Sequence, residues 1–403
     1  MNISPSSAAW SMLSLADKDP FTTYDVLRER GPIIWDPGMK CWIVLRYDIC
    51  KMIESDDETY AALTPLEDSL SLEIRGGRPA VSTLTGEEHT RMRRLYLKLL
   101  GPRVMPQYRD EHIIPVVNYV IDRFAEKRSA ELFDELVEPL PPRIMASLFG
   151  LPWKDDALMA DIAEWNQDMV AWIYNKSSEE LTRKAKRASG ELNRLFLPLV
   201  LERREKRGSD FISQIWTRAP EDWGEVSVND VMAIVRDASL GAGDTTTNAI
   251  ANMIYLFLSQ PAVREAVTKD QGHALNALVE ETLRLLGALQ WRFRKVNRDV
   301  SIAGTSIKKD ELVCLLHAAA NRDPQHYACP HVVDLKRKTP TDHLSFNVGS
   351  RICPGMFLAR LKMRECMKAL IRRFPELHLD PSKEAPRFLG FSHRRYSPLH
   401  VAF

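Results

Sequence analysis

The sequence contains one cysteine, flanked by two glycines, whose surroundings indicate a metal-binding role. Cys353 lies between Gly349 and Gly355, immediately before a long amphipathic helical pattern. Glycine allows a bound group to approach the backbone closely, and the free N–H groups at the start of a helix favour a thiolate over a thiol. A lone thiolate can fill one coordination position of haem iron, because the porphyrin fills the equatorial ones. Without this context, a buried structural cysteine in a turn would be the better interpretation.

An acid and an alcohol follow two glycines inside a second helical pattern. Gly241 and Gly243 precede Asp244 and Thr245 within an apolar pattern that spans residues 231–258. Each interior glycine costs about 1 kcal/mol of helix stability relative to alanine, and such a violation is expected where function demands it. Small residues leave room for a flat cofactor, and an acid beside an alcohol can relay protons. The competing interpretation is a helix weakened by glycine that carries a solvated aspartate.

Several basic residues could neutralise the carboxylates of a buried cofactor. His89 and Arg93 are four residues apart, which aligns them on one helix face. Arg294 and Arg351 are further candidates, because arginine makes bidentate contacts with carboxylates. Taken singly, each of these residues would be an ordinary surface residue.

Helical periodicity dominates the elements that must position these residues. Apolar residues recur at three- and four-residue spacing in the segments 87–100, 110–124, 231–258, 273–286 and 359–374. Ser227 and Asp230 form a capping-box-like pair before the central pattern, and Pro261 bounds its far end.

Strand signals are short and few. A hairpin is predicted from 33–35 and 41–45 around a Pro–Gly turn, and a second pair from 300–302 and 307–315. Segments 64–85 and 219–226 are predicted loops. Since neither an internal repeat nor an obvious linker is present, the sequence predicts one compact domain over residues 1–403, mainly α with minor β.

Composition excludes some classes of partner. The 55 Lys and Arg residues balance 54 Asp and Glu, and the net charge of +1 offers no bulk attraction to nucleic acid or an anionic membrane. Residues 1–21 lack the features of a signal peptide or anchor, and no apolar window is long enough for a membrane span. The six cysteines show no paired spacing, so we expect a cytoplasmic protein without a disulfide framework.

The segment 346–355 resembles the haem-binding loop of the cytochrome P450 family, whose pattern F-x-x-G-x-R-x-C-x-G it matches. The resemblance implies a P450 fold with a long central helix over a haem b, and Cys353 as the iron ligand. Asn347 stands where most members carry Gly or Ser. We expect the turn to survive, because asparagine tolerates left-handed conformations.

The other landmarks follow in family order from His89 to Gly355, so the resemblance covers essentially the whole chain. It implies that Asp244 is the proton-relay acid and that Thr245 hydrogen-bonds oxygen at the haem. Ala242 replaces a more usual glycine, which is expected to narrow the oxygen groove. The residues that it implies as contacts of the haem are His89, Arg93, Ala242, Arg294, Arg351, Cys353 and Gly355. It also implies a buried structural triad of Glu281, Arg284 and Arg337.

The substrate pocket is less well defined by the sequence. By analogy with the family it draws on the loop 64–85, on the C-terminal segment 388–397, and on an aromatic-rich helix pair around Trp165, Trp172 and Tyr174. The single residues assigned to it are Asp237, Leu240, Gly241, Leu289 and Trp291. Asp237 precedes Asp244 by seven residues and so lies on roughly the same helix face. We expect its carboxylate to bind a donor group of the substrate.

A separate electron donor is implied, because 403 residues leave no room for a fused reductase. We expect an acidic ferredoxin with its NAD(P)H reductase, steered by a basic patch on the thiolate side of the haem. The candidate patch residues are Arg94, Lys98, Arg103, Arg360, Lys362, Arg364, Lys368, Arg372 and Arg373. An ordinary solvated helix face is the competing interpretation.

The expected function is insertion of one oxygen atom from O2 into a small organic substrate, most simply as C–H hydroxylation. A competing function is that of a haem enzyme that performs peroxide-driven, dehydratase or oxidative coupling chemistry. The Asp244–Thr245 pair argues against the peroxide-using and dehydratase forms. A haem sensor or carrier would only bind gas or ligand at the iron. A helical scaffold protein without haem would require every one of these motifs to be coincidental.

Overall fold

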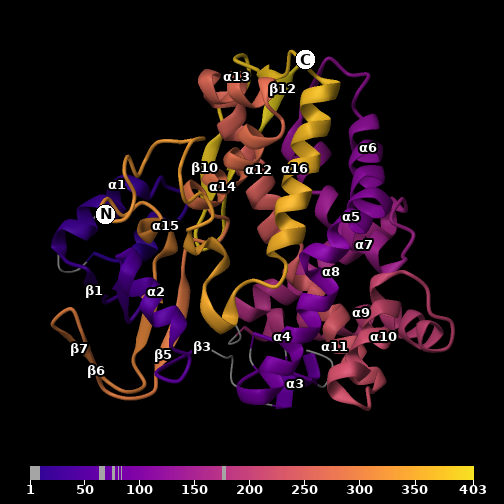
Figure 1. Cartoon of the computed structure of the whole chain (residues 1–403), viewed down its shortest axis with the longest axis horizontal. Coiled ribbons are helices and arrows are strands. Elements are labelled where there is room, and N and C mark those ends of the chain that lie inside the picture. The colour runs from indigo at the N-terminus through magenta and orange to yellow at the C-terminus, as the bar shows by residue number, and fades with distance from the viewer. Residues whose placement is uncertain (1–9, 63–68, 75–77, 80, 83, 175–177) are drawn as a thin grey trace.

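The structure is a computed structural model that describes residues 10–62, 69–74, 78–79, 81–82, 84–174 and 178–403. The first nine residues of the segment tested for a leader, and part of the predicted loop 64–85, therefore lie outside the described residues. A large helical body stands beside a smaller part rich in strands (Figure 1).

Helices make up most of the described chain. Their bounds are α1 Phe21–Arg30, α2 Tyr47–Ser55, α3 Ser69–Ile74, α4 Gly86–Leu100, α5 Met105–Tyr108, α6 Ile114–Asp122, α7 Leu140–Phe149, α8 Asp156–Tyr174, α9 Glu179–Glu205, α10 Phe211–Trp223, α11 Val228–Gly241, α12 Asp244–Ser259, α13 Pro261–Lys269, α14 His273–Leu285, α15 His317–Ala320 and α16 Met356–Arg373. Three predicted helices, 87–100, 273–286 and 359–374, are confirmed as α4, α14 and α16.

Two predictions along the helical body need correction. The segment 110–124 is not one helix, because a π-helical turn at Arg109–Ile113 precedes α6. The start of the predicted loop 219–226 is helical, because α10 continues to Trp223 even though Pro220 lies inside it.

The strands form one five-stranded sheet and three smaller sheets. Their bounds are β1 Ile33–Asp36, β2 Cys41–Val44, β3 Tyr60–Ala62, β4 Ser129–Glu131, β5 Arg292–Val296, β6 Val300–Ile302, β7 Thr305–Ile307, β8 Leu312–Leu315, β9 His378–Leu379, β10 Arg387–Gly390, β11 Arg394–Ser397 and β12 His400–Ala402. The large sheet has the order β1-β2-β8-β5-β3.

The first predicted hairpin is confirmed, and the second is only partly right. Strands β1 and β2 pair antiparallel, with Ile33 opposite Val44. Residues 307–315 are not one strand, because a turn that includes Asp310, with a φ of 69°, interrupts them. Strand β7 therefore pairs with β6, whereas β8 joins the large sheet between β2 and β5.

The central helical pattern is capped as predicted but is broken in its middle. The hydroxyl of Ser227 accepts a hydrogen bond from the N–H of Asp230, whose carboxylate accepts one from the N–H of Ser227 at 2.8 Å. Helix α11 ends at Gly241, and α12 begins at Asp244. Gly243 between them has a ψ of −95°, outside the helical range. The predicted continuous helix is thus two helices joined at Ala242–Gly243.

The main apolar core lies inside the helical body, and two smaller clusters lie on the strand-rich side. The main core includes Leu95 of α4, Ile250 of α12, Leu278 of α14 and Met367 of α16. Because these helices share one core, the segments before α12 and α16 are held in fixed positions. No helix of the described ranges combines the length and apolarity needed to cross a bilayer.

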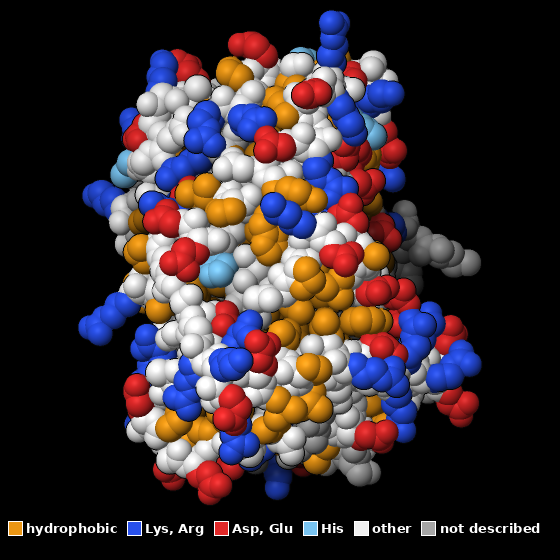
Figure 2. All heavy atoms as spheres, turned by 90° about the vertical axis from the view of Figure 1, so that its right-hand side faces the viewer, with side chains coloured by type: hydrophobic (Ala, Val, Ile, Leu, Met, Phe, Trp, Pro, Cys, Tyr) orange, Lys and Arg blue, Asp and Glu red, His pale blue; other side chains and the backbone are white. Residues whose placement is uncertain are grey.

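The face that carries α6, α7, α9 and α10 mixes positive and negative side chains, and neither sign dominates it. Figure 2 shows Lys and Arg interspersed with Asp and Glu on this face, with apolar side chains gathered near its middle. This mixture agrees with the net charge of +1.

Candidate functional site

The cysteine lies at the end of a tight loop that its own backbone closes. The N–H of Cys353 donates to the carbonyl of Phe346 at 2.7 Å. Gly349 has a φ of 69°, and a Cβ there would meet the carbonyl oxygen of Glu54 at 3.2 Å, so glycine is needed for both reasons. The loop leads into α16 through Gly355, whose N–H bonds to the sulfur.

Asn347 adopts a positive φ of 58°, as its tolerance of such conformations predicted, but its ψ is −179°. This combination lies outside the left-handed helical region and is found mainly for glycine. The side-chain amide of Asn347 donates to the carbonyl of Arg351 at 3.3 Å, which ties the strained residue back into the loop. The departure from the family pattern is therefore accommodated by a hydrogen bond of its own.

The thiol is less acidic than its place before a helix suggested. Burial raises the pKa of Cys353, and this effect outweighs the Gly355 N–H and the positive charges of Arg292, Arg93 and Arg360. The N–H at the helix start does favour the thiolate, as expected, but burial has the larger effect on the pKa. A bound metal ion deprotonates a coordinating thiol outright.

Two arginines on one face of strand β5 have buried nitrogen atoms without partners. Arg294 is 3% exposed, and its Nε and one terminal nitrogen make no hydrogen bond. The Nε of Arg292, two residues earlier and on the same strand face, is also buried and unpaired. Burying a cation without a partner is costly, so these side chains form an incomplete anion-binding site.

The other predicted cofactor contacts gather at the same loop. Arg93 donates to the carbonyl of Ile352, next to Cys353. Arg351 pairs with Asp57 at 3.1 Å and donates to the carbonyl of Leu84 at 3.1 Å. Buried His89 has its pKa lowered by burial and by the charges of Arg351 and Arg93.

The unpaired guanidinium nitrogens and the thiol match the charges and the metal of a haem. A haem offers two carboxylates and an iron, whereas the structure offers unpaired guanidinium nitrogens and one lone thiol beside them. Arg294 and Arg292 would hold a carboxylate, and Cys353 would ligate the iron. Arg292 is a cofactor candidate that sequence reasoning missed; its two-residue spacing from Arg294 places both on one face of the strand β5, which the sequence did not predict.

The break between α11 and α12 exposes an acid and an alcohol. Asp244 is exposed at the first position of α12, and the hydroxyl of Thr245 donates to the carbonyl of Gly241 at 3.3 Å. Half-buried Ala242 lies at the break itself. The threonine thus satisfies a carbonyl that the broken helix leaves without its usual partner.

A histidine that sequence reasoning passed over faces this acid. His393 precedes β11, which packs on α12, and it forms a β-bridge with Leu289. Burial lowers the pKa of His393, whereas the charge of Asp244 raises it and that of Arg292 lowers it. Because Arg292 also acts on Cys353, the acid and the thiol border the same region.

The predicted pocket residues are only partly brought together. Leu289 lies beside His393, and half-buried Leu240 and exposed Gly241 end α11 at the break. Trp291 is 5% exposed and packs against Phe391 in the apolar cluster of the strand-rich part, so it is a core residue.

Asp237 already has a partner in the loop that precedes α4. Its carboxylate accepts a hydrogen bond from the N–H of Val81 at 2.8 Å. Much of that loop, including residues 75–77, 80 and 83, lies outside the described residues. Asp237 as a ligand of the substrate stays a prediction.

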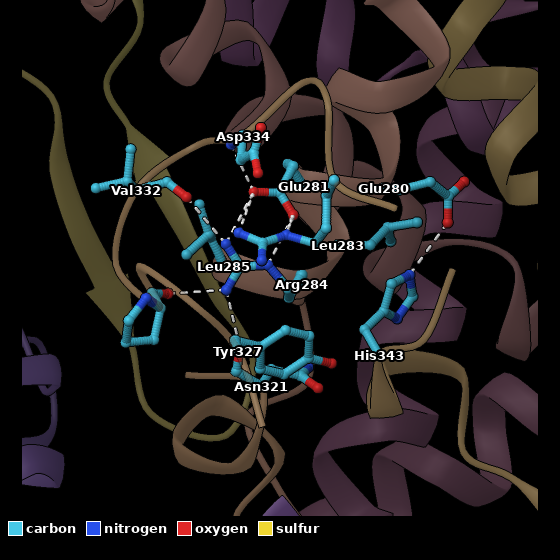
Figure 3. Close-up of polar contacts among 12 residues, drawn as sticks. Glu280, Glu281, Leu283, Arg284, Leu285, Asn321, Tyr327, Val332, Asp334 and His343 are labelled. Atoms are coloured by element: carbon cyan, nitrogen blue, oxygen red, sulfur yellow. Dashed lines mark hydrogen bonds and ion pairs between the residues drawn. The ribbon is translucent and has the colours of Figure 1, made fainter. Parts of the chain in front are cut away.

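Glu281, Arg284 and Arg337 meet in a buried ion-pair cluster. Figure 3 shows Glu281 and Arg284 at its centre. Arg284 binds both oxygens of Glu281, at 2.7 and 2.8 Å, and Arg337 binds one of them at 2.9 Å. Arg284 also donates to the carbonyls of Asn321 and Val332 at 2.9 and 3.0 Å. The cluster therefore fixes the segment after α15 against α14.

The predicted basic patch is smaller in the structure. Lys362 is not on the surface: it is 1% exposed, and burial lowers its pKa to about 7. The patch members that make ion pairs with Asp or Glu are Lys98, Arg360, Lys368 and Arg373. Among the described residues, no carboxylate lies within ion-pair distance of Arg94, Arg103, Arg364 or Arg372.

Replacing Glu281 by Gln is expected to destabilise the fold by roughly 3–5 kcal/mol at pH 7, because Arg284 is left buried without a counter-charge. Burial raises the pKa of Glu281, but its contacts with Arg284 and Arg337 outweigh this and hold the pKa below its usual value. The stabilisation is thus complete above roughly pH 4.3, the unfolded pKa, and is lost as pH falls through the lower folded pKa.

Denaturant unfolding of the wild type and Glu281→Gln across pH measures this difference. Glu265→Gln is the matched control, because Glu265 pairs with Lys269 at a site where both side chains are mostly exposed. Equal losses for the two variants at pH 7 would contradict a structural role for the cluster.

Comparisons with known proteins identify the family and the fold. The profile of the family described as Cytochrome P450 matches residues 5–393. A C-19 steroid 1alpha-hydroxylase of Sorangium cellulosum (strain So ce56) is 28% identical over 361 residues, covering 90% of this chain and 88% of that protein. A biotin biosynthesis cytochrome P450 of Bacillus subtilis (strain 168) is 27% identical over 408 residues and 100% of both chains.

Solved structures share the fold. P450BioI in complex with hexadec-9Z-enoic acid ligated acyl carrier protein superposes with a TM-score of 0.84 at 25% identity, covering 96% of this chain and 98% of that one. CYP109E1 from Bacillus megaterium in complex with testosterone gives 0.83 at 25% identity, with 95% and 99% covered. Matched over nearly its whole length by the family profile, and sharing the fold of these enzymes, this chain belongs to the cytochrome P450 family and is a monooxygenase.

Proposed function

We propose that the enzyme hydroxylates a C–H bond of a small organic molecule with O2, using a haem b held by Cys353 and electrons from a separate acidic ferredoxin. The observation that carries this proposal is the break at Ala242–Gly243, followed directly by Asp244 and Thr245. A break in the middle of a helix lowers its stability and is expected only where function requires it. A break beside the cofactor would give the side chains of Asp244 and Thr245 the access that proton delivery requires.

The haem, when bound, supplies an iron centre at which O2 is reduced, and a thiolate ligand favours O–O cleavage. Within the protein, the carboxylate of Asp244 takes up a proton from solvent, because it is exposed at the start of α12. The hydroxyl of Thr245 passes that proton toward the cofactor side.

Haem binding itself should depend on Arg294. Replacing Arg294 by Leu removes a buried guanidinium that we assign to a haem carboxylate, so haem should transfer to excess apomyoglobin at least about tenfold faster. Lys295→Leu is the matched control, because Lys295 is exposed on the opposite face of β5 and pairs with Asp310. Equal rates of transfer from both variants would contradict the assignment.

Oxygen insertion is tested with a ligand found by screening for a low- to high-spin shift of the haem. With ferredoxin, reductase, NAD(P)H and 18O2, the wild type should place one labelled atom in the product. Thr245→Ala should lower product per NAD(P)H by up to about tenfold, as expected for one lost hydrogen bond, with hydrogen peroxide made instead. Thr246→Val, at the neighbouring threonine, is the control and should form as much product per NAD(P)H as the wild type. A product without the 18O label would contradict the proposal.

Electron delivery should depend on those patch arginines, such as Arg364, that pair with no carboxylate in the described part of the chain. Arg364→Glu is expected to slow reduction by an acidic ferredoxin, and the wild-type rate should fall with added salt, because salt screens attraction between charges at the protein surface. Carbon monoxide binding to the chemically reduced protein should stay intact. Lys309→Glu is the control, since Lys309 lies in the turn before β8. Unchanged reduction of Arg364→Glu would reject this patch.

A further inference from the structure

A cavity of about 320 Å3 lies where α1, α12, α14 and β11 meet. It is lined by Phe21, Tyr255, Leu256, Ser259, Gln260, Leu285, Leu286, Arg322, His331 and Tyr396. Tyr255 follows Asp244 by eleven residues along α12, or about 16 Å at 1.5 Å per residue. The cavity is therefore separate from the oxygen-activating site.

A buried guanidinium without an acidic partner forms part of its wall. Arg322 is 8% exposed, and within the described part of the chain no carboxylate lies within ion-pair distance of it. One terminal nitrogen donates to the carbonyl of Leu285 at 2.9 Å, and the other is 3.4 Å from Nδ1 of His331. Its Nε is buried and makes no hydrogen bond. The charge of Arg322 is thus only partly compensated.

The charge persists at neutral pH. Burial, and then the charge of Arg284, lower the pKa of Arg322 to about 10, whereas Asp19 and Asp25 act in the opposite sense from a distance. Asp25 is itself engaged with Arg28 at 2.7 Å and lies 3.5 Å from His331. The ring of Phe21 covers the guanidinium at 3.7 Å, which shields it from water on that side.

Phenol groups supply donors on the opposite wall. The rings of Tyr255 and Tyr396 are stacked, with centroids 3.4 Å apart and planes 11° from parallel. Burial, and then the neighbouring Tyr255, raise the pKa of Tyr396, so its hydroxyl stays protonated. The two phenols are hydrogen-bonded to each other, which leaves the pair one hydroxyl proton to donate to a ligand. Leu256 and Leu286 complete the wall with apolar surface.

We propose that this cavity binds a small organic carboxylate, with its carboxylate on Arg322 and the tyrosine hydroxyls and its apolar body against Leu256 and Leu286. A carboxylate supplies the counter-charge that Arg322 lacks, and guanidinium and phenol donors match its lone pairs. The volume lies at the lower end for small-molecule sites, which limits the ligand to a compact one.

Titration of the haem-loaded enzyme with 4-fluorobenzoate, followed by 19F NMR line width, tests this site. The neutral isostere 4-fluorobenzamide should bind at least about tenfold more weakly, because it lacks the charge that pairs with Arg322. The Soret band, recorded in the same titration, should not move, since the site lies away from the iron. Comparable affinities for the two probes, or a Soret shift that tracks the line width, would overturn the proposal.

Variants locate the binding. Arg322→Gln should abolish the response, and Tyr396→Phe should weaken it about tenfold; the second variant keeps the test valid should the first fail to fold. Arg194→Gln is the control, because the side chain of Arg194 is 75% exposed on α9. Unchanged binding in Tyr396→Phe, or an equal loss in Arg194→Gln, would refute the site.

Discussion

The structure depends on one electrostatic constraint, which is that the thiol of Cys353 borders the same space as Arg292 and Arg294, two arginines with buried nitrogen atoms that have no partner among the described residues. Burial raises the pKa of Cys353 even though Arg292, Arg93 and Arg360 oppose this effect. Arg294 keeps two buried nitrogen atoms without partners. Each imbalance is costly alone, and one ligand with an iron and two carboxylates removes both. The folded chain is therefore built for a haem, which explains why a protein of this family tolerates such a site.

The position of the thiol is set by a chain of hydrogen bonds that begins at the buried ion-pair cluster. Arg284 fixes the carbonyl of Asn321, and the side chain of Asn321 donates to the hydroxyl of Ser345 at 3.0 Å. Ser345 in turn donates to the carbonyl of Leu283 on α14 at 2.5 Å. Since Ser345 comes immediately before Phe346, where the cysteine loop closes, these hydrogen bonds connect the cluster to the start of that loop.

Local signals in the sequence predicted those features that depend on a few neighbouring residues. The capping box at Ser227 and the hairpin of β1 and β2 were both predicted correctly, because caps and tight turns use nearby side chains. The helix break at Ala242–Gly243 was not predicted, although its glycines were noted. Glycine lowers helix stability without deciding whether a helix breaks, and here neighbouring elements decide.

Burial was the property that the sequence predicted least well. Lys362 was assigned to a surface patch from its place in a run of basic residues, yet it is 1% exposed. Trp291 was assigned to the pocket but packs in the cluster of the strand-rich part. Both errors arise because long-range packing determines which face of an element is covered. His393 lies in the segment 388–397 that was assigned to the pocket, but its place near Asp244, like that of Arg292 near Cys353, is set by the folded chain.

The absorption spectrum of the ferrous carbon monoxide complex tests the central claim most directly. Haem ligated by the thiolate of Cys353 should give the long-wavelength Soret band that thiolate coordination produces, and Cys353→His should lose that band while retaining haem. A wild-type protein that binds haem but lacks the long-wavelength band, or a Cys353→His variant that keeps it, would contradict the account.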